Sequence, residues 1–84
     1  MRLLLQQRPD GREAPRFVQL QLQPDLLGGW TLLRESGQIG GRSTLKRELY
    51  TDQASALAAL ASARDAQLKR GFQLIFAQGA DAPR

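Results

Sequence analysis

A glycine-rich stretch, residues 37–41, is the part of this sequence best suited to binding chemistry, because basic residues lie on both sides of it. Its backbone N–H groups could form a small concave surface for a phosphate, with Arg42 beside it. Gln38 could hydrogen-bond a sugar or a base edge. The alternative is a hairpin connection of turn residues that binds nothing. The residues that we predict to contact nucleic acid, some of which could form one basic patch, are Arg34, Ser36, Gly37, Gln38, Gly40, Arg42, Lys46 and Arg47.

Catalytic chemistry finds little support in the residue types. The sequence has no histidine and no cysteine, which removes the usual general base near neutral pH and the commonest zinc ligands. Ser36 and Ser43 therefore have no histidine to activate them. Glu35 and Glu48 could meet across neighbouring strands, but each is next to an arginine and suits a surface ion pair. We expect no enzymatic activity, no metal site and no cofactor.

The charge balance favours a polyanionic partner. Twelve basic and eight acidic residues give a net charge of +4 and a pI near 10.7. Such a balance attracts nucleic acid through counterion release. A compositional origin is the alternative, because arginine greatly outnumbers lysine and alanine is abundant, as a GC-rich coding genome produces.

The length of 84 residues fits a single domain, which we expect over residues 1–77, followed by a disordered tail over residues 78–84. No segment approaches the roughly 18 apolar residues that span a bilayer. The opening Leu3–Leu5 run is too short for the core of a signal peptide, which needs about 7 residues. We therefore expect a cytoplasmic protein with no membrane partner.

Five strands and one helix are predicted from the periodicity. Residues 2–6, 16–23, 30–36, 44–50 and 72–77 have strand character. Thr51 or Asp52 can cap a helix that ends at Gly71. The expected fold is α+β, with an antiparallel sheet of four to five strands and one helix packed on one face.

The same periodicity predicts which side chains are buried. Val18, Leu20 and Leu22 alternate with glutamines and should share a dry face. Trp30 is expected in the core, and a base-stacking role is its alternative. In the last strand we expect one face to hold Phe72, Leu74 and Phe76 and the other to hold Gln73, Ile75 and Ala77. The expected inward stripe of the helix comprises Ala54, Leu57, Ala58, Ala61 and Leu68, with Leu60 broadening it.

Over about residues 2–76 the sequence resembles the WGR domain family. That family has an aromatic-led strand, a hairpin to Gly-Gly-Trp, an Arg-Glu step into Trp-Gly-Arg-Ile-Gly, another strand, an alanine-rich helix, and a Lys-rich end running into Gly-Tyr. The residues that carry the resemblance are Arg16-Phe17, the alternation through Leu22, Gly28-Gly29-Trp30, Arg34-Glu35, Gly37, Ile39-Gly40, Ala54, Leu57 and Lys69-Arg70-Gly71-Phe72.

The naming motif itself differs, because Ser36-Gly37-Gln38 stands where the family has Trp-Gly-Arg. In DNA-dependent poly(ADP-ribose) polymerases that tryptophan packs on sugar at a DNA end, and the arginine helps to hold the backbone. Serine cannot stack, and glutamine cannot make a charge-assisted bond to phosphate. The resemblance implies a bacterial, stand-alone WGR-like module that binds nucleic acid weakly. The alternative is a protein-interaction or regulatory domain that has lost this site.

Overall fold

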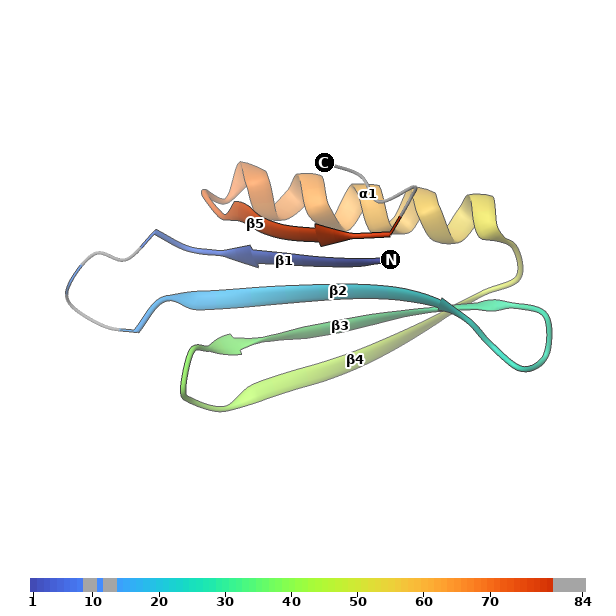
Figure 1. Ribbon diagram of the computed structural model, residues 1–84, viewed down its shortest axis with the longest axis horizontal. Coiled ribbons are helices and arrows are strands. Elements are labelled where there is room, and N and C mark those ends of the chain that lie inside the picture. Colours follow the sequence, from blue (N-terminus) through green and yellow to red (C-terminus); the bar gives the residue numbers. More distant parts are fainter. Residues whose placement is uncertain (9–10, 12–13, 80–84) are drawn as a thin grey trace.

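The computed structural model describes residues 1–8, 11 and 14–79. It has an α+β fold in which five antiparallel strands form one sheet and one helix covers a face of it, as predicted (Figure 1). The elements are β1 (Arg2–Gln6), β2 (Arg16–Pro24), β3 (Trp30–Gln38), β4 (Ser43–Tyr50), α1 (Gln53–Lys69) and β5 (Gln73–Gln78).

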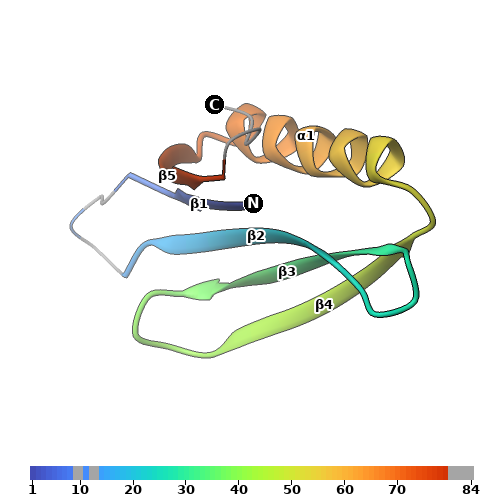
Figure 2. The same cartoon turned by 45° about the vertical axis from the view of Figure 1, so that its right-hand side comes forward.

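The strand order in the sheet is β4-β3-β2-β1-β5. The first four strands form a meander, and α1 carries the chain across the sheet so that β5 can pair with β1 (Figures 1 and 2). β4 and β5 are therefore the edge strands. The register places Leu32 opposite Leu22 and Glu48, and Arg34 opposite Leu20 and Lys46. Since directly opposed residues share a face, these pairs identify the side that faces the helix.

The core lies between this face and α1. Val18, Leu20 and Leu22 are buried, as their alternation predicted, and they pack with leucines of β1 and β3. Trp30 is partly buried and packs against the core, which agrees with its expected place. The buried hydrophobic residues are Leu3, Leu5, Val18, Leu20, Leu22, Leu32, Ala56, Leu60, Ala63 and Phe72.

The helix begins at the predicted cap but buries a different face. The Ser55 backbone N–H donates to the Asp52 carboxylate at 2.8 Å, so Asp52 is the N-cap. Ala56, Leu60 and Ala63 are buried, at a spacing of four and three residues. The prediction that Ala54, Ala58 and Leu68 face the core was wrong, because all three are exposed; Leu57 and Ala61 lie at the margin of the buried stripe.

The alternation expected along β5 is broken by an irregularity in its pairing with β1. Leu4 is opposite Phe76 and Leu5 is opposite Leu74, so the register shifts by one residue at Ile75. The extra residue of a β-bulge reverses the faces beyond it. Phe72 and Leu74 both point inward and so share a face as predicted, but Phe76 is 42% exposed and Ala77 is the half-buried residue instead.

Among the described residues no helix covers the opposite face of the sheet, which we call the open face (Figure 2). On β4 this face carries Leu45 and Leu49, which are 62% and 71% exposed, with Arg47 between them. β5 extends through Gln78, one residue into the stretch predicted to be a disordered tail. Gly79 follows in an exposed bend, and residues 80–84 of the predicted tail lie outside the described residues. Within the described part of the chain, no helix is long and apolar enough to cross a membrane.

Truncating one leucine on the observed buried face of α1 and one on the face predicted from sequence tests which of the two faces packs on the sheet. Leu60→Ala removes a fully buried side chain, so we expect it to lower the free energy of unfolding by about 2–5 kcal/mol. Leu68→Ala, on the exposed side, should cost less than about 1 kcal/mol. Urea unfolding followed by circular dichroism measures both, and equal losses would contradict the observed orientation.

Candidate nucleic-acid interface

A basic concavity of about 250 Å³ lies on the helix side of the sheet, below the C-terminal end of α1. We call it the basic pocket. Its walls come from β2, β3, β4, the last turn of α1 and the turn that follows the helix. Four cationic side chains take part in the lining, and the described lining includes no carboxylate. The lining residues are Arg16, Phe17, Val18, Leu20, Arg34, Ser36, Thr44, Lys46, Gln67, Arg70 and Phe72.

The end of the helix positions one side of this pocket. Gly71 has φ +90°, a conformation that glycine adopts without strain. The Phe72 N–H donates to Gln67 C=O at 3.0 Å, and the Gly71 N–H donates to Leu68 C=O at 3.1 Å. These two bonds form a Schellman motif. The motif fixes Arg70 and Gln67 at the rim while Phe72 enters the core.

An ion pair holds Arg34 in place at the β3–β4 side. Arg34 Nε lies 2.5 Å from Glu48 Oε1, and the Tyr50 hydroxyl donates to Glu48 Oε2 at 2.7 Å. The Tyr50 hydrogen bond and the Arg34 charge lower the pKa of Glu48, while partial burial opposes them. The same hydrogen bond raises the pKa of Tyr50. Glu48 therefore stays ionised and neutralises Arg34. The other three cations of the pocket form no ion pair among the described residues, and the Lys46 charge also contributes to the lowered pKa of Glu48.

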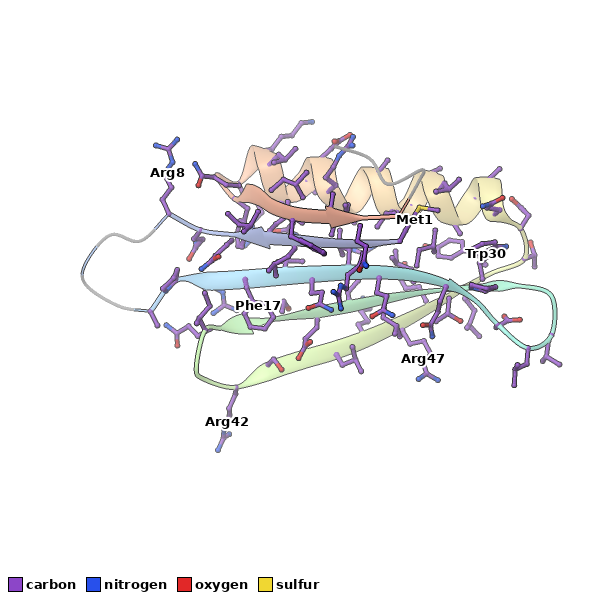
Figure 3. All side chains as sticks on the ribbon, in the orientation of Figure 1. Met1, Arg8, Phe17, Trp30, Arg42 and Arg47 are labelled. Atoms are coloured by element: carbon purple, nitrogen blue, oxygen red, sulfur yellow. The ribbon has the colours of Figure 1, made fainter. Side chains whose placement is uncertain are left out.

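The structure brings only part of the predicted patch together. Arg34, Ser36 and Lys46 all line the basic pocket. Arg47 is opposite Leu33 and points to the open face, away from α1 (Figure 3). Arg42 projects from the tip of the β3–β4 hairpin (Figure 3). The four cations that could have formed one basic patch therefore occupy two faces and a loop; they are Arg34, Arg42, Lys46 and Arg47.

Most of the backbone N–H groups at the hairpin tip that could bind a ligand already donate hydrogen bonds within the protein. The Gln38, Ile39 and Gly41 N–H groups donate to Arg42, Pro15 and Gln38 carbonyls respectively. The Gln38 side-chain amide donates to Ala14 C=O at 3.3 Å. The tip is thus bonded to the segment before β2, and the concave phosphate surface expected from residues 37–41 is not formed by these three groups. Gly40, with φ +78°, supplies the turn.

Gly37 has a structural reason to be glycine. A Cβ at this position would overlap the Arg42 carbonyl oxygen and lie 2.7 Å from Ser43 Cα. The hairpin strands can approach this closely only without a side chain. Its requirement is therefore set by the hairpin itself and needs no ligand.

Two pocket cations, Arg16 and Arg70, were not among the predicted contact residues. Arg16 begins the strand opposite Gln38, so strand pairing brings it near the predicted stretch. Arg70 lies at the C-terminus of the helix, where a cation opposes the negative end of the macrodipole without any ligand, so its type alone does not indicate a binding role. The order of the elements could have indicated Arg70. A helix that follows one edge strand and leads to a strand at the other edge of the same sheet ends over that sheet. Carboxylates do not help to define another centre: no group of three or more in the described residues could hold a metal ion.

Comparison of the chain with known proteins found no relative. No family model, no curated protein and no solved structure matches the chain.

Removing the Tyr50 hydroxyl should raise the pKa of Glu48 toward its ordinary value of 4.5, because it deletes the largest lowering contribution. A carboxyl with a lowered pKa in the folded state stabilises the protein above pH 4.5, and this stabilisation is lost as the pH falls through the lowered pKa. The wild type should therefore lose more stability between pH 5 and pH 3 than Tyr50→Phe does. Carboxyl NMR titration measures the pKa of Glu48, and urea unfolding across this pH range measures the stability. Equal losses of stability in the wild type and in Tyr50→Phe would contradict the hydrogen bond from Tyr50 to Glu48.

Gly37→Ala should destabilise the hairpin by about 1–3 kcal/mol, because the added methyl group meets backbone atoms that cannot move independently. Gly41→Ala is the matched control. Its Cβ would lie 3.4 Å from Gln38 Cβ, an ordinary contact, so we expect little change. Thermal unfolding of the two variants decides the matter, and a tolerated Gly37→Ala would show that the close approach is not required.

Proposed function

We propose that this chain is a non-enzymatic, WGR-like module that acts in the cytoplasm and binds nucleic acid weakly, through contacts from the basic pocket to the phosphate backbone. One observation carries the proposal. Arg16, Arg34, Lys46 and Arg70 come from separate elements, yet all four line one concavity. Phosphate contacts made by Lys and Arg supply most of the affinity in non-specific nucleic-acid binding.

The balance of charge in the pocket favours an anion. Glu48 neutralises Arg34, so the free positive charge comes from Arg16, Lys46 and Arg70. The nearby helix C-terminus contributes about half a negative charge, which opposes anion binding. Three cations outweigh this half charge. Arg42 at the exposed hairpin tip can extend the contact along a strand of nucleic acid.

The resemblance to the WGR family supports the same surface. Ser36 occupies the position at which the family has its first motif residue, tryptophan, and it lines the basic pocket. Serine is much smaller than tryptophan, so this departure leaves room at a place where the family has a ring. Gln38 is bonded to Ala14, and we therefore assign it a supporting role for the hairpin rather than a direct contact.

Binding should be measurable by fluorescence anisotropy with short single- and double-stranded DNA and RNA. Contacts from three cations to phosphates predict an affinity that falls about 20- to 40-fold between 50 and 200 mM salt, from a slope of roughly −0.7 to −0.9 per contact. Absence of binding at high micromolar protein in about 50 mM salt would overturn the proposal.

Lys46 and Arg47 provide an internal control, because they are neighbours in sequence and point to opposite faces of the sheet. Lys46→Glu should weaken binding about tenfold or more and reduce the salt dependence. Arg47→Glu changes the net charge equally but should have a much smaller effect. Equal losses would mean that net charge alone, and no defined pocket, attracts the nucleic acid.

A further inference from the structure

The open face carries an apolar strip along the edge strand β4. Leu45 and Leu49 are 62% and 71% exposed, and Arg47 lies between them on the same face. We call these three residues the β4 strip. Leu26 and Leu27 of the β2–β3 loop are almost fully exposed, and they line a concavity of about 660 Å³ together with Arg47 and Leu49. Exposed leucines grouped in this way mark an interaction surface more often than leucines scattered singly.

The backbone of β4 is available on its outer side. Only β3 pairs with it among the described elements. The Gln38 N–H bonds to the Arg42 C=O at the hairpin end, and bonded pairs then alternate along an antiparallel ladder. This alternation directs even-numbered β4 residues toward β3. The outward N–H and C=O groups therefore belong to the residues of the β4 strip.

The two edges of the sheet differ in how they are protected. β5 is six residues long, and its pairing with β1 is interrupted by the register shift at Ile75. β4 is eight residues long and pairs with β3 without a shift from Ser43 to Tyr50. Bulges and short strands protect an edge from further pairing. β4 has neither, so it is the edge suited to accept another strand.

Charge decides which strand fits. Arg47 makes no ion pair within the described part of the chain. Asp25 lines the same concavity, but its Oδ1 accepts the Leu27 and Gly29 N–H groups at 2.8 Å. A second copy of this chain suits the strip poorly. The symmetric pairing that would match Leu45 with Leu49 of the other copy also sets Arg47 against Arg47, and like charges directly opposite are destabilising.

We propose that the β4 strip docks an extended segment of a partner protein by strand addition. The segment carries an acidic residue opposite Arg47 and apolar residues two positions away on each side, opposite Leu45 and Leu49. Main-chain hydrogen bonds to the outward groups of β4 supply affinity, and the alternate side chains supply specificity. This surface is independent of the basic pocket, because Lys46 points to the other face.

A seven-residue probe tests the pattern directly: acetylated Thr-Val-Thr-Glu-Thr-Val-Thr amide, with a matched peptide in which lysine replaces the central glutamate. Titration into the ¹⁵N-labelled full chain should shift the amide signals of Leu45, Arg47 and Leu49. The glutamate peptide should bind about 2- to 10-fold more tightly than the lysine peptide, as expected for a cross-strand charge pair. Arg47→Glu should reverse that order, whereas Lys46→Glu should preserve it.

Three results would overturn the proposal. The first is an absence of shifts in β4 at millimolar peptide, with the fold intact by the remaining amide signals. The second is a response of β4 that is equal for both peptides. The third is a dimer in sedimentation equilibrium whose formation is abolished by Leu45→Lys, because that would assign the strip to a second copy of the chain.

Discussion

The packing of one narrow helix face against a five-stranded sheet is the constraint on which the structure depends. Leu60 is fully buried, and Ala56 and Ala63 one turn to either side are small enough to let α1 approach the strands closely. A helix is about 10 Å wide, whereas five strands spaced about 4.8 Å apart span roughly twice that width. A single helix therefore cannot cover the whole face, and it leaves the other face bare.

This limited coverage explains where the two candidate surfaces lie. At the C-terminal end of α1 the chain turns at Gly71, and the Phe72 side chain is buried in the core. The space beside this helix end stays open, and basic residues line it. On the flank toward β4, the Arg34–Glu48–Tyr50 network takes the place of apolar contacts with the helix. On the open face, nothing among the described residues covers Leu45 and Leu49.

Much of the fold could be predicted from local sequence. The strict alternation through Val18, Leu20 and Leu22 identified a strand with one dry face, and Asp52 and Gly71 marked the helix ends by their capping chemistry. The buried face of α1 could not be predicted in the same way, because the helix is rich in alanine and several stripes have similar apolarity. Leu60 was expected only to broaden the inward stripe, and the tertiary contact with the sheet makes it the centre of the buried stripe, between Ala56 and Ala63. The bulge at Ile75 likewise depends on pairing with β1, a strand about seventy residues away along the chain.

The candidate site was only partly accessible from sequence for the same reason. Residues that are adjacent in sequence on a strand point to opposite faces, so Lys46 and Arg47 separate once the register is fixed. Arg16 and Arg70 join the pocket through strand pairing and through the turn after the helix, which are both long-range features. The sequence left open whether the glycine-rich tip offers free donors or is only a hairpin connection, because its bonds to Ala14 and Pro15 depend on a neighbouring loop.

Chemical-shift mapping with a short single-stranded oligonucleotide at low salt tests most directly whether the cations beside the helix end form one binding pocket. We expect the perturbed amides to cluster around Ser36, Thr44 and Arg70, which come from three separate elements. Perturbations confined to the open face, around Leu45 and Leu49, would contradict this expectation.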